Sequence, residues 1–303
     1  MNISVVIPVY NKEKFVVDCI HSILHQSMLP KELIIINDGS TDNSLKVIND
    51  YISKQETEVK IKIISINNSG VSIARNKGVK VCSSEYVAFL DSDDVWEESY
   101  LYEMVSLITE FPECGMYSCN HMIKKLEIEK YVASNRLHYG ESIIADFFKL
   151  SQSYSVVNSS KVIVKKDCFL DVGGFPPDIR YGEDLYVWIR LALISKTAFL
   201  NKPLVTINQF EDESRSSRVN DVLYPLLEIK RDLYFDNPEL KKYLKILFRN
   251  SYLFRLQEGN KKTALKTILK SYRISLAYTF ILLPFILLPS GVMKVLYKKY
   301  KQR

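Results

Sequence analysis

Strands and helices alternate along the first 95 residues of this chain. Four short runs rich in apolar residues predict strands at Ile3–Val9, Leu33–Ile36, Val59–Ile66 and Tyr86–Leu90. The segments between them carry apolar residues at helical spacing. Strands that are apolar on both faces are typical of parallel sheets, whose crossover helices cover both sides. The pattern therefore predicts an α/β domain with a mostly parallel, Rossmann-like sheet and helices on both faces.

The fourth strand runs into three acids within four positions: Asp91, Asp93 and Asp94. Ligands of open α/β sheets bind at the carboxyl ends of the strands, so all three acids are expected at a ligand crevice. Such acids repel one another unless a cation lies among them, and Mg²⁺ is usually held by one or two carboxylates plus substrate phosphates. Two interpretations stay open: a metal–diphosphate site, or a solvated acidic turn before a helix that begins near Trp96.

Several nucleotide-binding fingerprints are missing from the sequence. No G-x-G-x-x-G follows the first strand, and no G-x-x-x-x-G-K-[ST] occurs in the chain. A nucleotidyltransferase would also need a Gly-rich basic loop after the first strand, and Pro8–Lys12 is not one. The sequence thus disfavours a dinucleotide oxidoreductase, a P-loop NTPase and a nucleotidyltransferase.

Beyond residue 95 the alternation becomes less regular. Residues 120–160 are expected to be irregular apart from a helix around Glu141–Leu150, and a helix opens at Gly182-Glu183-Asp184. The other expected elements are a helix near Glu97–Phe111 and strands at Met116–Cys119, Val162–Val164 and Thr197–Ile207.

Five short motifs, taken together, resemble the family 2 inverting glycosyltransferases of the GT-A fold. They are Val6–Asn11, Asn37–Asp42, Ala74–Gly78, Leu90–Asp94 and Gly182–Asp184, the last followed by Trp188. Each motif alone is weak, but their order and their positions at strand ends and helix starts are specific. The resemblance covers roughly residues 1–215, which sets a catalytic domain at 1–218 and a helical C-terminal region at 219–303.

The resemblance implies roles for individual residues. Those that match the family's nucleotide-sugar contacts are Pro8, Tyr10, Asn11, Glu13, Asp38, Arg75, Asp91 and Ser92. Of these, Asp38 matches an acid that binds a uracil-type base, although it and Asn11 could equally serve only their own turn and helix cap. Asp93 and Asp91 match the ligands of Mg²⁺ or Mn²⁺.

The resemblance also assigns Asp184 as the general base and Glu183 as its catalytic neighbour, and it suggests Arg215 or Arg218 as diphosphate contacts. A single base opposite the leaving group gives one displacement and inversion. A helix N-terminus stabilises the carboxylate anion and so lowers its basicity, which burial would have to offset. The two acids also suit a plain helix-dipole cap, and this alternative stays open.

The C-terminal region differs from the rest in charge. Residues 241–303 hold 15 lysines and arginines against one acid, Glu258, so their net charge is +14, which leaves −8 of the overall +6 for residues 1–240. Expected helices span about 219–235, 238–257, 260–272 and 274–300. The 20 residues Ile274–Met293 are uncharged but contain Pro284 and Pro289. A membrane span and a cap folded on the catalytic domain are both possible; contact with an anionic membrane surface fits better.

The sequence therefore predicts a metal-dependent transferase that moves a sugar from a nucleotide-diphosphate donor, expected to be a UDP-sugar, to a saccharide or lipid-linked acceptor in cell-surface polysaccharide or glycolipid assembly. A non-catalytic sugar-nucleotide-binding or scaffold protein is the alternative. The five scattered cysteines and the absence of a signal peptide favour the cytoplasm. We expect a peripheral protein on the inner face of a bacterial plasma membrane, with no nucleic-acid partner.

Overall fold

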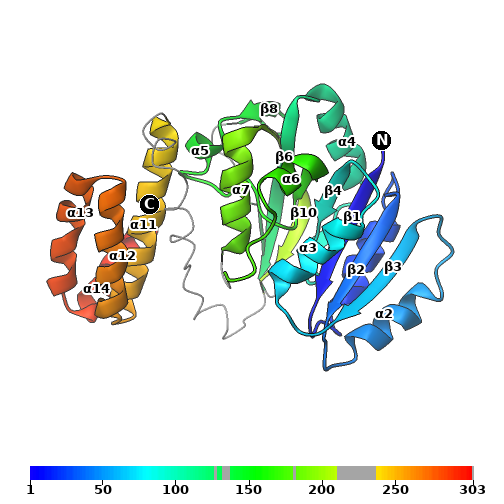
Figure 1. The fold of residues 1–303 in the computed structure, drawn as a ribbon, viewed down its shortest axis with the longest axis horizontal. Coiled ribbons are helices and arrows are strands. Elements are labelled where there is room, and N and C mark those ends of the chain that lie inside the picture. The colour runs from blue at the N-terminus through cyan, green and yellow to red at the C-terminus, as the bar shows by residue number, and fades with distance from the viewer. Residues whose placement is uncertain (126–127, 132–136, 180–181, 210–236, 302–303) are drawn as a thin grey trace. The chain divides into compact units, whose positions relative to one another are not determined.

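The structure, a computed structural model, describes residues 1–125, 128–131, 137–179, 182–209 and 237–301 (Figure 1). The chain divides into two compact units. The first comprises residues 1–150 and 154–212, and the second comprises residues 151–153 and 213–303.

Four parallel strands form one half of the sheet in the first unit, in the spatial order β3-β2-β1-β4. They are β1 (Ile3–Val9), β2 (Glu32–Asp38), β3 (Lys60–Ile66) and β4 (Tyr86–Phe89). The connecting helices are α1 (Val16–Leu24), α2 (Ser44–Ile52) and α3 (Val71–Val81). On β1, Val5 and Ile7 pack into one core cluster with α1, whereas Val6 lies against Gly78 of α3. The helices therefore cover both faces, as predicted.

The other half of the sheet is mixed and continues from β4 in the order β9-β6-β10-β5. Its strands are β5 (Val95–Trp96), β6 (Cys114–Lys125), β9 (Val162–Lys165) and β10 (Lys196–Asn208), with β7 (Ile128–Tyr131) and β8 (Ser142–Ala145) at the side. Its helices are α4 (Tyr100–Glu110), α5 (Phe147–Leu150), α6 (Lys166–Asp171) and α7 (Glu183–Ile194). Strand β9 runs antiparallel to β4, with Phe89 opposite Val162. The amino end of β9 therefore lies at the edge where β4 ends.

The prediction of a helix around Glu141–Leu150 is wrong over its first half. Ser142–Ala145 forms β8 and pairs antiparallel with β10, with Ala145 opposite Thr197. Its two adjacent isoleucines suit a strand, and the available edge of β10 supplies the hydrogen bonds, which local periodicity cannot reveal. Only α5 is helical in this stretch.

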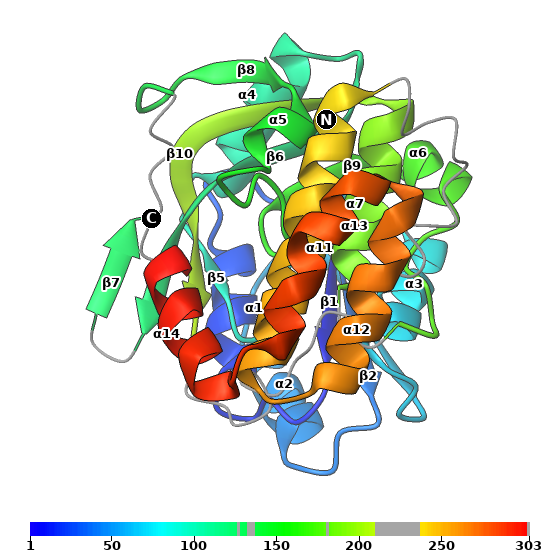
Figure 2. The same ribbon diagram turned by 90° about the vertical axis from the view of Figure 1, so that its left-hand side faces the viewer.

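The second unit is a bundle of helices around a core of its own (Figure 2). Its elements are α11 (Pro238–Gln257), α12 (Lys261–Lys270), η1 (Ser271–Arg273), α13 (Leu276–Leu282), η2 (Leu283–Leu287) and α14 (Ser290–Lys301). Two helices start at the caps that their sequence indicates, because Asn237 accepts a hydrogen bond from Leu240 N and Asn260 accepts one from Thr263 N.

The single helix predicted over 274–300 is wrong. Pro284 lies in the short η2 turn and Pro289 directly precedes α14, because neither can donate the hydrogen bond that a continuous helix requires there. Within the described part of the chain, every helix is too short or too polar to cross a membrane. The helix predicted at 219–235 lies outside the described residues.

Candidate active site

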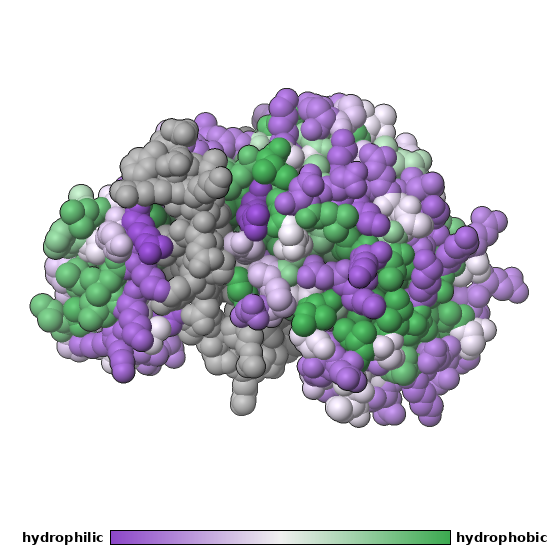
Figure 3. Space-filling model, viewed as in Figure 1, coloured by the Kyte–Doolittle hydropathy of each residue, from purple (hydrophilic) through white to green (hydrophobic). Residues whose placement is uncertain are grey.

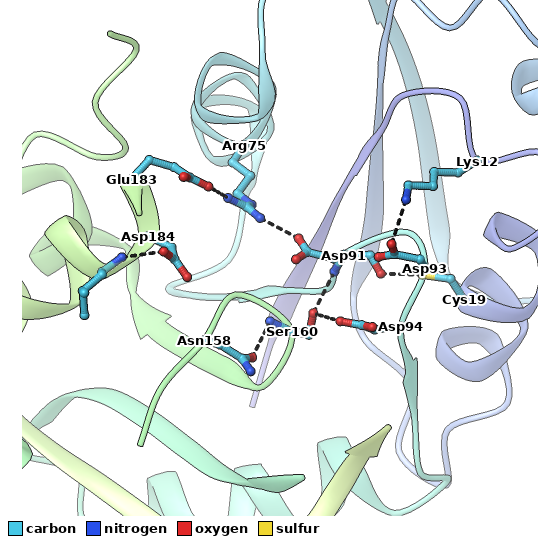
Figure 4. Close-up of polar contacts among 11 residues, drawn as sticks. Lys12, Cys19, Arg75, Asp91, Asp93, Asp94, Asn158, Ser160, Glu183 and Asp184 are labelled. Carbon is cyan, nitrogen blue, oxygen red and sulfur yellow. Dashed lines mark hydrogen bonds and ion pairs between the residues drawn. The ribbon is translucent and has the colours of Figure 1, made fainter. Parts of the chain in front are cut away.

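The expected site residues gather at one edge of the sheet because β1, β2 and β4 are parallel and all end there (Figure 4). The loops after these strands carry residues 10–13, 39–43 and 90–94. Antiparallel β9 begins at the same edge and brings Asn158 and Ser160 beside the acids. Residues that are far apart in the sequence therefore meet without long irregular connections.

Asn11 joins the loop after β1 to the loop after β2. Its Oδ1 accepts from the backbone N–H of Thr41 at 2.8 Å and its own N–H donates to Ser40 Oγ at 3.2 Å. It adopts a positive φ of 52°, a conformation that asparagine tolerates better than most residues. The suggestion that Asn11 caps a helix is wrong, since α1 begins at Val16. Asn11 instead fixes the relative position of two loops.

Asp38 organises a third loop. Its two carboxylate oxygens accept from the backbone N–H groups of Ser69 and Gly70, at 2.7 and 2.9 Å, and the residue is 4% exposed. The next residue, Gly39, has φ of +69°, and a Cβ there would lie 2.7 Å from Asn68 N. A glycine is thus required for the loops after β2 and β3 to approach this closely.

Of the remaining residues expected on the nucleoside side, Pro8 is buried within β1, whereas Tyr10 is 45% exposed beyond its end. Glu13 accepts from the backbone N–H of Asn43 at 2.9 Å. The Glu13–Asn43 contact joins the loop before α1 to the loop before α2. Tyr10 stays exposed beside these loops.

Two of the three acids after β4 are paired with bases. Arg75 Nη2 donates to Asp91 Oδ1 at 2.6 Å, and Lys12 Nζ donates to Asp93 Oδ2 at 2.7 Å. The assumption that only an added cation relieves the repulsion is therefore wrong, because the chain supplies two positive side chains. Ser92, between the two acids, is buried.

The prediction that Asp94 lies at the ligand crevice is wrong. It is 4% exposed and accepts hydrogen bonds from Ser160 Oγ and from Asn208 N, the latter at 2.9 Å. Burial raises the pKa of Asp94, and the charges of Asp93 and Asp91 raise it further. Asp94 therefore fastens the acidic loop to β9 and β10 rather than facing a ligand.

Arg75 connects the acidic loop to the start of α7. Besides Asp91, its guanidinium donates from Nη1 to Glu183 Oε1 at 3.0 Å, and it lies 5.1 Å from the centre of the Phe175 ring. Arg75 is 3% exposed, although it belongs to a helix of mostly small and apolar residues. A buried guanidinium requires such partners, and it fixes both carboxylates in turn.

Asp184 is the second residue of α7. Its Oδ1 accepts from the backbone N–H of Leu185 at 2.7 Å, and Figure 4 shows it turned toward the side on which Arg75 and Asp91 lie. Gly182, at φ 79°, permits the sharp entry into the helix. Beneath the site, Trp188 packs at 5.6 Å from Phe175 in a buried aromatic cluster.

The electrostatics of Asp184 favour a proton acceptor. Burial raises its pKa above the ordinary value, and the charge of Asp91 acts in the same direction, while Arg75 and the Leu185 N–H oppose it. Burial likewise raises the pKa of Glu183, with Asp184 adding to it and Arg75 opposing it. Burial thus offsets the helix-terminus effect that the sequence left unresolved.

The carboxylates of Asp91 and Asp93 suit a hard cation chemically. The Asp91 side chain is 36% exposed, and in the described residues its contacts involve Oδ1 and leave Oδ2 available. No group of three metal-ligating side chains is present among the residues that the structure describes. A Mg²⁺ or Mn²⁺ ion there would need the remaining ligands from a bound phosphate, as is usual for Mg²⁺.

Three contacts were not indicated by the sequence: the Lys12 pair with Asp93, and the bonds of Ser160 and Asn208 to Asp94. Each depends on the strand order or on a loop packing that no local pattern encodes. Arg215 and Arg218 lie outside the described residues.

The sequence of the first unit matches a known protein family. Residues 4–155 match the model described as glycosyl transferase family 2. The chain belongs to this family. Within it, the chain is 29% identical over 221 residues to the glycosyltransferase GlyA of Streptococcus pneumoniae, a match that covers 67% of this chain and 30% of GlyA. The chain thus spans less than a third of the length of that relative.

Two other similar proteins are informative. The poly(ribitol-phosphate) beta-glucosyltransferase of Bacillus spizizenii is 43% identical over 97 residues, which are 31% of this chain and 15% of that protein. Residues 1–349 of S. aureus TarS, solved with UDP-GlcNAc, superpose with a TM-score of 0.69 at 20% identity, over 89% of this chain and 81% of the TarS chain. The structural match establishes the GT-A fold.

Proposed function

We propose that this chain is an inverting glycosyltransferase that moves a sugar from a UDP-sugar to a hydroxyl group of a saccharide or lipid-linked acceptor. The observation that carries the proposal is the convergence of Asp184 with Arg75, Asp91 and Glu183 at one edge of the sheet. Two similar proteins add support, since S. aureus TarS was solved with UDP-GlcNAc and the Bacillus spizizenii protein is a poly(ribitol-phosphate) beta-glucosyltransferase.

In this proposal Asp184 accepts the proton of the acceptor hydroxyl as the oxygen attacks the anomeric carbon opposite the diphosphate. Its raised pKa makes it a better base than an exposed aspartate. Glu183, bound to Arg75, is the neighbour that keeps the start of α7 in register with the acidic loop. One displacement with one base inverts the anomeric configuration.

The donor is proposed to lie along the ends of β1, β2 and β4. Tyr10 offers an exposed ring to the base, Asn11, Glu13 and Asp38 hold the surrounding loops, and Asp91 with Asp93 would hold Mg²⁺ or Mn²⁺. When bound, such a cation neutralises charge on the leaving diphosphate.

The decisive variant is Asp184→Asn. Loss of the base is expected to lower kcat by about a thousandfold, while UDP affinity stays within about twofold because Asp184 does not contact the nucleotide in this proposal. Asp178→Asn is the matched control, since Asp178 is exposed and lies six residues earlier. Full transfer activity in Asp184→Asn would remove Asp184 from its role.

The alternative, a binding or scaffold protein, is separated by donor hydrolysis. An enzyme releases UDP slowly from its own donor even without acceptor, whereas a scaffold binds the donor and leaves it intact. A panel of UDP-sugars incubated with Mn²⁺, followed by chromatography for UDP, distinguishes the two.

We place this activity at the inner face of a bacterial plasma membrane because of the surface of the helical unit. Seven apolar residues of α13, η2 and α14 are more than 40% exposed, and Figure 3 shows hydrophobic side chains gathered over α13. They are Leu276, Phe280, Ile281, Leu287, Val292, Val295 and Leu296, here called the apolar face. Exposed basic residues are close in sequence to this face: Arg273 precedes α13, and Lys294, Lys298 and Lys299 lie within α14. Apolar burial plus attraction to anionic lipid would hold such a surface.

A further inference from the structure

Lys12 bridges two loops that are 81 residues apart in sequence. Its ammonium lies 2.7 Å from Asp93 Oδ2, and the side chains of Lys12 and Asp93 are 32% and 13% exposed. Figure 4 shows the lysine reaching the acidic loop from the side opposite Arg75. The lysine therefore contacts one of the two carboxylates that suit a divalent cation.

Hydrogen bonds hold the backbone of Lys12, whereas its side chain is held at the ammonium, by Asp93 at 2.7 Å and by the Phe15 ring, whose centre lies 5.9 Å away. The backbone N–H donates to Ser44 Oγ at 2.7 Å, and the carbonyl accepts from Phe15 N and Val16 N, both at 3.0 Å. The stem of the side chain has four rotatable bonds, and its ammonium is a strongly hydrated point charge. Lys12 can therefore redirect its charge without moving the loop.

Arg75 provides the contrast within the same site. Its side chain is 4% exposed and holds two carboxylates at once, so leaving either would strand a buried charge. The Lys12 side chain is 32% exposed and pairs with one carboxylate, and partly exposed ion pairs contribute little stability. Of these two basic residues, Lys12 is the one whose ion pair can break at the lower cost.

We propose that Lys12 occupies the cation position at Asp93 until the donor arrives, and then turns its ammonium to the donor diphosphate. This deepens the proposed function and rests on it. While Lys12 pairs with Asp93, a divalent cation must displace a positive charge in order to bind. A donor diphosphate offers that charge a new partner, so nucleotide and cation are expected to bind cooperatively.

The test is Mn²⁺ binding, followed by electron paramagnetic resonance of the free ion, with and without UDP. In the wild-type protein, UDP should tighten Mn²⁺ binding by at least about fivefold. Lys12→Gln should bind Mn²⁺ alone about fivefold more tightly than wild type, and should bind UDP more weakly in the presence of Mn²⁺. Lys14→Gln is the control, because Lys14 is exposed in the same segment and its loss changes the net charge equally.

Opposite effects on Mn²⁺ and on UDP in Lys12→Gln, with neither in Lys14→Gln, support the proposal. Equal Mn²⁺ affinities in the two variants overturn it. If UDP binds but Mn²⁺ does not, the cation assignment and the role of Lys12 both fail, whereas the nucleotide donor stands. If UDP itself does not bind to the wild-type protein, the proposed function fails first.

Discussion

The two units of this chain differ in where they place charge and apolar surface. In the first unit, charged groups of the candidate active site are buried in pairs, as with Arg75 at 3% exposure and Glu183 at 8%. In the helical unit, apolar side chains are exposed, as with Leu287 at 81% and Ile281 at 67%. Buried ion pairs cost desolvation energy and are rarely kept for stability alone. Exposed apolar patches are equally costly unless something covers them.

The difference indicates where each unit does its work. Pairing inside the first unit fixes the carboxylates of the candidate active site, so we expect its function to depend on internal geometry. The second unit carries apolar side chains on its surface, so we expect its function to depend on a partner surface. Variants matched between the two units test this division.

The largest effect is expected at Arg75. Arg75→Met removes the shared partner of Asp91 and Glu183 and leaves two carboxylates at a poorly solvated position. We expect a loss of about 3–5 kcal/mol in the free energy of unfolding. The matched change Arg273→Met, at an exposed position of the helical unit, should alter it by less than about 0.5 kcal/mol. Urea unfolding of both variants measures this, and equal losses would contradict the division.

A somewhat smaller effect is expected on membrane binding. Replacing Phe280, Ile281 and Leu287 by serine removes exposed apolar area from the apolar face. Binding to phosphatidylglycerol vesicles should fall by at least about tenfold, since full burial of one such side chain is worth about 1.5–3 kcal/mol.

The control variant for this experiment replaces exposed apolar residues of the first unit. Tyr102→Ser with Leu170→Ser removes side chains that are 57% and 52% exposed in the first unit, and vesicle sedimentation should not change. Unaltered sedimentation of the triple variant would mean that the apolar face meets something other than lipid.

Glu32 offers a test of buried charge away from the site. It is 1% exposed, at the start of β2, and accepts from Ser4 Oγ, Ser83 N and Lys62 Nζ at 2.6–2.8 Å. Burial alone raises its pKa, but the hydrogen bonds from Lys62, Ser83 and Ser4 prevail and lower the pKa to about 2. The depressed pKa means that its stabilisation is complete above the ordinary value of 4.5 and is lost as the pH falls toward 2.

Glu32→Gln should therefore lose about 2 kcal/mol of unfolding free energy at pH 7, the usual contribution of hydrogen bonds to a charged group. The difference from wild type should shrink as the pH is lowered from 4.5 to 2. Glu58→Gln, at an exposed position, is the control and should differ little at any pH. A difference that persists unchanged at pH 2 would show that the charge of Glu32 is not its source.

The comparison also separates what the sequence can predict from what it cannot. The strands from Ile3 to Phe89 were predictable because each is a short segment rich in apolar residues, and the ends of parallel strands must meet. The burial of Asp94 was not, because Ser160 reaches it only through the antiparallel placement of β9. In the tail, Pro284 and Pro289 signalled the breaks in sequence, yet the apolar run still favoured one long helix.

The smallest expected effect is a displacement of the pH profile. Burial, helped by Asp91, raises the pKa of Asp184, so this base becomes protonated at a higher pH than an exposed aspartate, about 3.9. Only the ionised form of Asp184 accepts a proton, so kcat should decline as the pH falls. The midpoint of this decline should lie above about 3.9, the pKa of an exposed aspartate. Glu183→Gln should retain an acid limb, and the residual rate of Asp184→Asn should lack it. Circular dichroism at each pH controls for unfolding, and a limb at or below pH 3.9 in the folded protein would show that burial does not tune this base.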